Sequence, residues 1–180
     1  MATISTKEEI IAQLIAALNE TLAYCSEIND EIFFHQPETK WSIAQDIEHL
    51  TTATNSSRLA YILPKFIVRL YAGKPNRPSR SYEELVDKYK SKLEKGGKAG
   101  GRFVPKPISS AIGKQVLLDD FSNAMNKLAI ALKKKWETNQ LDKYLAPHPL
   151  LGKITLRELG YFNIYHTFHH LALIKQKTQH

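Results

Sequence analysis

Histidines carry the main chemical signal in this 180-residue chain, which contains seven of them. His166 and His170 are four residues apart in a segment with helical periodicity, residues 156–177, so both imidazoles lie on one helix face. Two imidazoles one turn apart can bind the same metal ion. Leu159, His166 and Leu173 are spaced by seven, so the pair interrupts an apolar stripe, where ring nitrogens need partners. A metal ion would satisfy one nitrogen of each ring.

Two further histidines bear on this site. His169 lies near the same helix face, and the pair His166 and His169 is a geometric alternative. His49 lies in a second predicted helix, and taken alone it has the character of a half-buried helix histidine. The neighbours of His49 on that flank are small or polar, which suits the lining of a pocket: Gln45, Ala53, Ser56 and Ala60.

The elements that would position these histidines are helices. Four segments have amphipathic helical periodicity: residues 6–27, 42–71, 113–138 and 156–177. Capping boxes open three of them, at Thr6 with Glu9, Ser42 with Gln45, and Thr155 with Glu158. Pro64 is expected to kink the second helix, and no segment has a convincing strand pattern. This sequence predicts an all-α four-helix bundle, in which metal sites lie between facing helices.

A long connection separates the second and third predicted helices. Within it, residues 81–95 predict a short polar helix, and the glycine-rich residues 96–101 are flexible by composition. Residues 65–106 hold 12 Lys and Arg against 4 Asp and Glu, whereas the rest of the chain holds 13 against 14. We therefore expect one domain, residues 1–180, with a basic flexible insertion at about residues 73–108.

The composition excludes several classes of protein. Hydrophobic residues make up 43% and charged residues 24%, which is ordinary for a globular chain and argues against wholesale disorder. No run of 18 apolar residues occurs, so no membrane span is expected, and the N-terminal residues lack the apolar core of a signal peptide. The single Cys25 cannot form an internal disulfide, which favours a cytoplasmic location and a packing role. Helix-turn-helix and zinc-finger spacings are missing, so nucleic-acid binding is not expected.

Several short motifs together resemble the DinB-like family. They occur in the family's order and span most of the chain: Trp41-Ser42 followed by His49-Leu50; Phe103-x-Pro105-x-Pro107; His148-Pro149-Leu150-Leu151-Gly152-Lys153-Ile154-Thr155; and His166 followed by His169-His170-Leu171.

The resemblance implies a four-helix bundle with a divalent metal held by three histidines. Carried over to this chain, the metal ligands are His49, His166 and His170, with His169 as an alternative to His170. Three imidazoles suit Zn, Ni or Fe. Relatives of this kind include enzymes that use low-molecular-weight thiols and often form homodimers. No other catalytic residue follows from the sequence.

The function expected from this resemblance is a metal-dependent thiol-S-transferase or hydrolase that acts on a small electrophilic substrate. The alternative is a non-catalytic, metal-binding stress-response protein of the same fold. A further hypothesis concerns the basic insertion. If it folds over the metal site, Lys98, Arg102 and Lys106 would bind the carboxylates of a thiol such as glutathione or bacillithiol.

Overall fold

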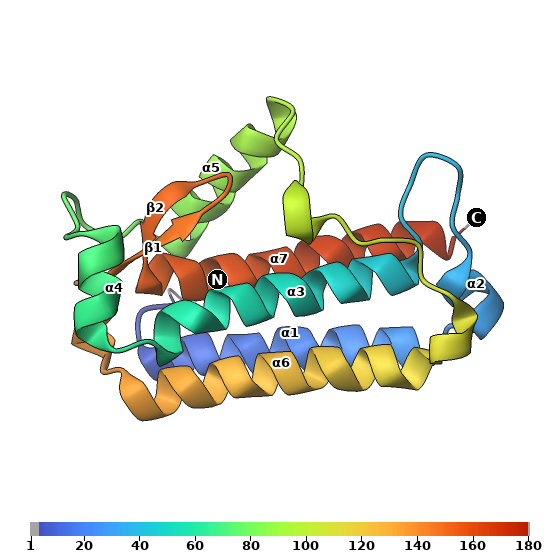
Figure 1. The fold of residues 1–180 in the computed structure, drawn as a ribbon, viewed down its shortest axis with the longest axis horizontal. Coiled ribbons are helices and arrows are strands. Elements are labelled where there is room, and N and C mark those ends of the chain that lie inside the picture. Colours follow the sequence, from blue (N-terminus) through green and yellow to red (C-terminus); the bar gives the residue numbers. More distant parts are fainter. Residues whose placement is uncertain (1–3, 180) are drawn as a thin grey trace.

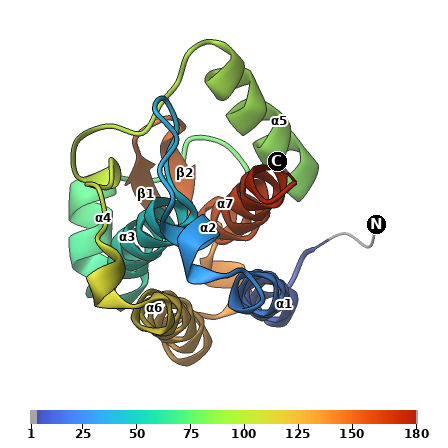
Figure 2. The same cartoon turned by 90° about the vertical axis from the view of Figure 1, so that its right-hand side faces the viewer.

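Four long helices form the framework of the computed structural model, which describes residues 4–179 (Figure 1). Seen end-on, they occupy the four corners of a bundle (Figure 2). This arrangement confirms the predicted all-α bundle with a long crossover between its second and third long helices. The bounds of the four helices are α1 Lys7–Ser26, α3 Ile43–Ile62, α6 Lys114–Lys135 and α7 Leu156–Lys177.

Local side-chain caps explain where these helices begin. Thr6, Ser42 and Thr155 each accept a hydrogen bond from the backbone N–H three residues later, and the side chain at that position bonds back to the backbone of the cap. Each box satisfies two backbone donors that a helix start would otherwise leave unpaired. The three predicted capping boxes are therefore confirmed.

The predicted helix over residues 42–71 is wrong in one respect, because it is two helices. Helix α3 ends at Ile62, and α4, Lys65–Ala72, begins after Pro64. Leu63 is extended, with a ψ of 148°, because the ring of a following proline disfavours the helical conformation. The break turns α4 away from the axis of α3 (Figure 1).

A short β-hairpin precedes α7, although the sequence shows no strand pattern that predicts it. Strand β1, Leu145–His148, pairs antiparallel with β2, Gly152–Thr155, and His148 lies opposite Gly152. Each strand has only four residues, too few for a clear alternation of polar and apolar side chains.

The long crossover carries a helix of its own. Helix α5, Tyr82–Glu94, has its cap at Ser81 and confirms the predicted polar helix. Helices α4 and α5 and the hairpin lie on the α3 and α7 side of the bundle, away from α1 and α6 (Figure 2). The remaining elements are the short helix α2, Asp30–Phe34, and three 3-10 turns: η1 Gly101–Phe103, η2 Ser110–Ile112 and η3 Thr138–Gln140.

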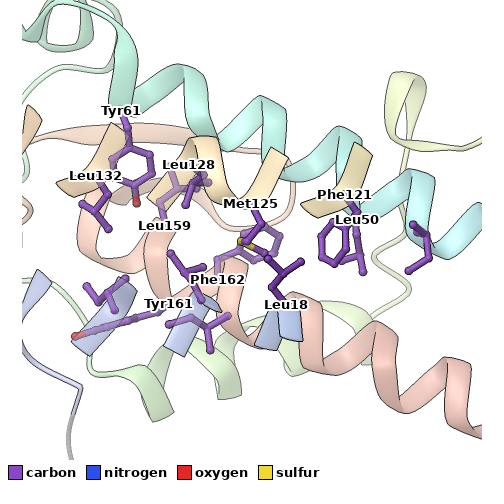
Figure 3. Packing of buried hydrophobic residues seen from close by; sticks show 14 of the residues in the cluster. Leu18, Leu50, Tyr61, Phe121, Met125, Leu128, Leu132, Leu159, Tyr161 and Phe162 are labelled. Carbon is purple, nitrogen blue, oxygen red and sulfur yellow. The ribbon is translucent and has the colours of Figure 1, made fainter. Parts of the chain in front are cut away.

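The apolar core lies between the four long helices (Figure 3). Leu18, Leu50, Phe121 and Met125 meet there, and each exposes 2% of its surface or less. Helix α3 is also covered on its other side, because five consecutive residues from Ile43 to Ile47 are all buried and so point in every direction around the helix axis. Polar residues of α3 and α7 are thus buried under α5, the hairpin and the crossover. Among the described residues, no helix has both the length and the apolar character needed to cross a membrane.

Candidate metal centre

Three histidines from two helices converge on one point. His49 comes from α3, and His166 and His170 come from α7; all three are buried. One ring nitrogen from each lies within 4.8 Å of the other two. The closest pair is Nε2 of His49 and Nε2 of His166, which are 3.1 Å apart. The structure thus brings together the helical pair found by spacing and the third histidine implied by the resemblance.

His169, the alternative to His170, occupies a different position. Its ring stacks on that of Tyr165, with 5.9 Å between centroids. The side chain is half-buried and lines the cavity described below. Among the described residues, the cluster of converging nitrogens includes His170 and leaves out His169.

The ring of His49 is oriented by the crossover. Its Nδ1 lies 2.7 Å from the backbone oxygen of Phe103. Because a carbonyl oxygen can only accept, Nδ1 carries the hydrogen and donates it. In the neutral ring, Nε2 then keeps its lone pair and directs it toward the centre of the cluster.

A buried carboxylate orients His170 in the same way. Nδ1 of His170 lies 3.0 Å from Oδ1 of Asp46, whose other oxygen pairs with Lys177. A carboxylate that holds one ring nitrogen fixes the tautomer and leaves the other nitrogen for a metal, an arrangement typical of metal-binding histidines. Asp46 is not among the site residues expected from the sequence. Its position three residues before His49, on one helical face, is the signal that would have drawn attention to it.

The electrostatics favour neutral imidazoles. Burial lowers the pKa of His49, although the hydrogen bond to Phe103 and the charge of Asp46 oppose this shift. Burial lowers the pKa values of His166 and His170 well below the ordinary value, and neighbouring histidines lower them further. Burial raises the pKa of Asp46, while the nearby Lys177 opposes this shift. Neutral imidazole is the form that binds a metal ion.

A cavity of about 430 Å³ opens beside the three histidines. Its walls are mostly apolar and come from α3, α4, α5, the hairpin and α7. Lys98 and Arg102 also line it, whereas Lys106 does not. Apolar side chains of the wall include those of Leu59, Leu63, Val68, Leu93, Leu150 and Phe162.

A comparison with protein families gives a match that covers most of the chain. The family model of the DinB superfamily matches residues 13–174, a range that includes all three histidines. The chain belongs to the DinB superfamily. No curated protein and no solved structure matches it significantly. The family assignment expected from the motifs is therefore confirmed, and a three-histidine group able to hold a metal ion is present in this DinB superfamily member.

Residues 98–107, which we call the strap, pass beside α3, and the first part of the strap, up to Phe103, lines the cavity. Three α3 side chains contact the strap: His49 through Phe103, Gln45 through the oxygen of Pro105 at 3.3 Å, and Ser56 through Arg102 at 2.6 Å. The basic crossover of this DinB superfamily member therefore forms part of the cavity wall.

Trp41 also contacts the cluster. Its ring lies 5.1 Å from that of His49 and is nearly parallel to that of His170 at 6.4 Å, centroid to centroid. The motif that contains Trp41 and His49 did not predict a contact between this tryptophan and the histidines, because Trp41 precedes the start of α3 and lies far from α7 in the chain.

Some basic residues of the crossover form ion pairs away from the cavity wall. Arg77 and Arg80 bond to Glu158, which is completely buried at the start of α7. Burial alone would raise the pKa of Glu158, but hydrogen bonds from Arg77, from the backbone of Thr155 and from the backbone of Arg80 outweigh it and lower the pKa. Two of the basic residues thus compensate an internal charge.

The single cysteine lies apart from the cavity. Cys25 is fully buried in the core near the end of α1. Burial raises the pKa of its thiol to about 12, so the thiol is protonated and unreactive at neutral pH. This environment agrees with the predicted packing role.

Proposed function

We propose that this protein is a metal-dependent transferase that joins a low-molecular-weight thiol to a small, mostly apolar electrophile. One observation carries the proposal: three neutral imidazole nitrogens converge at the wall of an apolar cavity. The proposed metal ligands are Nε2 of His49, Nε2 of His166 and Nε2 of His170. Zn, Ni or Fe would suit this set of nitrogen ligands.

The donor set fits a metal ion. His49 and His170 each have Nδ1 held by an oxygen acceptor, so their Nε2 lone pairs are available. A divalent ion bound by three imidazoles keeps a position open, where it lowers the pKa of a bound thiol or water. With the attacking group supplied in this way, the chain needs no nucleophile of its own, in keeping with the burial of Cys25.

The cavity favours an enzyme over a protein that only stores metal. About 430 Å³ is within the range of small-molecule sites, and its apolar wall suits an apolar substrate. Lys98 and Arg102 would bind the carboxylates of the thiol. In the reaction, the thiol sulfur forms a bond to the electrophilic carbon, which releases an electron pair to a leaving group or an adjacent atom. The thiol proton goes to solvent or to the product.

The first test is elemental analysis of the purified protein. We expect near-stoichiometric metal, lost in His49→Ala and in His170→Ala. His35→Ala is the matched control, because His35 is exposed at the end of α2 and outside the cavity wall. A wild-type chain that stays empty after reconstitution with Zn, Ni and Fe would contradict the proposal.

The second test is catalysis by the loaded protein. Glutathione and bacillithiol are each supplied with an alkyl halide, an epoxide and an unsaturated ketone, and thiol consumption is followed. We expect metal-dependent consumption with at least one pair. Water as the attacking group, seen as hydrolysis without thiol consumption, would instead favour a hydrolase.

A further inference from the structure

A fourth histidine lines the cavity without belonging to the metal cluster. His148 ends β1, and its Nδ1 lies 3.2 Å from the backbone nitrogen of Leu150 and 3.1 Å from that of Leu151. A backbone N–H can only donate, so Nδ1 accepts both bonds and carries no hydrogen. The neutral ring must then carry its hydrogen on Nε2. The hairpin turn thereby fixes the tautomer of His148.

The surroundings of His148 keep the ring neutral. Its edge packs against Phe162 at 4.2 Å between centroids, and Tyr89 lies at 6.3 Å. Burial among these rings lowers the pKa of His148 to about 4. The imidazole is therefore uncharged at neutral pH, and it cannot act as a base through Nδ1, because the two backbone donors occupy that nitrogen.

The Nε2–H of His148 has no partner within residues 4–179. Both hydrogen bonds of the ring involve Nδ1, and the side chain is only half-buried while it lines the cavity. The ring of Phe162 contacts both His148 and the metal cluster, because its centroid lies 4.2 Å from that of His148 and 4.8 Å from that of His166. A small molecule that lies along Phe162 would reach both the donor and the cluster.

We propose that His148 binds the electrophilic substrate by donating Nε2–H to a carbonyl oxygen, so that the site takes small apolar carbonyl compounds such as α,β-unsaturated ketones. This inference rests on the proposed function, because it treats the cavity as the substrate site. A neutral donor among apolar side chains favours a neutral acceptor, since a carboxylate would lose more hydration on entering. The hydrogen bond would also draw electrons toward the oxygen and make the β-carbon a better target for the thiol.

The test uses two probes that differ in one atom group. The first is 4-phenylbut-3-en-2-one, and the second is the diene in which a methylene group replaces its carbonyl oxygen. Binding is measured by titration calorimetry without thiol, on the full chain as purified and on its His170→Ala variant. We expect the ketone to bind about tenfold more tightly than the diene in both proteins, as for one hydrogen bond in an apolar site.

The variant His148→Asn is designed to remove only the donor. Its side-chain oxygen can still accept from the backbone N–H groups of Leu150 and Leu151, while its amide nitrogen takes the place of the ring carbon Cδ2 and leaves the position of Nε2 empty. We expect this variant to bind the diene as the wild type does and to lose the preference for the ketone. His35→Asn is the matched control and keeps the preference.

Several results would overturn the assignment of His148. These are ketone binding that is absent or no tighter than diene binding, or a preference that survives in a folded His148→Asn chain. Nitrogen NMR gives an independent readout if that variant does not fold. It should show the Nε2–H form of His148 and a shift of that proton on addition of ketone, and an Nδ1–H form would refute the inference.

The outcome is separable from that of the proposed function. A chain that binds no metal but prefers the ketone through His148 would refute the metal-dependent enzyme and keep the carbonyl site. A chain that binds metal and consumes thiol, but shows no preference for the ketone, would refute only the role of His148.

Discussion

The two halves of α7 bury polar side chains in contrasting ways. Near its start, Glu158 receives hydrogen bonds from Arg77 and Arg80 and from the backbone of Thr155, so both carboxylate oxygens have donors. Two turns later, the partner of His166 is Nε2 of His49, and His170 lies beside them, so that three rings of the same kind converge. A buried group supplied with opposite partners by its own chain stabilises the fold. Convergent groups of one kind indicate a site for something else.

The pKa shifts of Glu158 and His166 show the same contrast between the two halves of α7. The pKa of Glu158 is lowered despite burial, because cations and backbone donors face the carboxylate. The pKa of His166 is lowered by burial and by neighbouring imidazoles, so it stays neutral. Glu158 thus keeps its charge for the fold, and His166 keeps a lone pair for a ligand.

The largest effect is expected from Glu158→Ala. This change leaves Arg77 and Arg80 without their partner, and breaking a buried ion pair costs several kcal/mol. Because both arginines are partly exposed, we expect a loss near the low end, about 3 kcal/mol of unfolding free energy. Urea unfolding of the metal-free protein measures it. A loss as small as that of an exposed residue such as Glu83→Ala would show that the arginines find other partners.

At the metal cluster we expect a large loss of metal affinity and only a small loss of stability. His170→Ala should lower metal affinity by more than about 100-fold, beyond the effect of removing an orienting partner. His170→Ala should also destabilise the metal-free chain less than Glu158→Ala does, because it removes a neutral ring and Asp46 keeps its pairing with Lys177. Competition with a chelator of known affinity measures binding, and His35→Ala is the control. If Glu158→Ala and His170→Ala destabilise the chain equally, the two halves of α7 do not differ in the way we infer.

Asp46 tests whether the metal cluster depends on its orienting partner. Asp46→Asn removes the charge that faces Nδ1 of His170 and its pairing with Lys177. We expect metal affinity to fall by about 10-fold or somewhat more, the range for such partners. Asp119→Asn, an exposed change on α6, should have no effect in the same chelator competition. Unchanged affinity in Asp46→Asn would mean that packing alone orients His170.

The buried histidines should make the stability of the metal-free protein depend on pH. The pKa of His170 lies well below 6.5 in the folded chain and returns to that value on unfolding. Below about pH 6.5 the unfolded chain therefore binds a proton that the native chain does not. The free energy of unfolding then decreases as the pH is lowered, by about 1.4 kcal/mol per pH unit for each such ring. Unfolding of the metal-free protein at several pH values should show a shallower decline in His170→Ala. An identical decline in the wild type and the variant would show that groups other than His170 take up the protons.

The smallest effect is expected from Lys98, which lines the cavity. Lys98→Met should raise the KM for glutathione about threefold, as expected for an exposed charge pair of less than 1 kcal/mol. Lys106→Met, on the same strap but outside the cavity wall, should leave KM unchanged. Steady-state kinetics of the loaded protein compares them. Equal effects of both changes would point to the overall charge of the strap instead of a contact at the cavity.

The sequence by itself determined the features that depend on neighbours within about one helical turn. Capping boxes at Thr6, Ser42 and Thr155 marked helix starts, and the four-residue spacing of His166 and His170 placed both rings on one face. Helical periodicity led to the bundle. His49 joined the pair only through a resemblance of motifs, because no local rule relates α3 to α7.

Tertiary structure alone decided the rest. The contact of Asp46 with His170 joins residues 124 apart, and that of Arg77 with Glu158 joins residues 81 apart. The strap contact at His49, the tautomer of His148 and the cavity likewise depend on how the crossover and the hairpin pack on α3 and α7. Local patterns specify which face of a helix is apolar, but they do not specify which distant backbone oxygen or carboxylate meets a buried ring. That is set only when the elements pack and each buried polar group must find a partner.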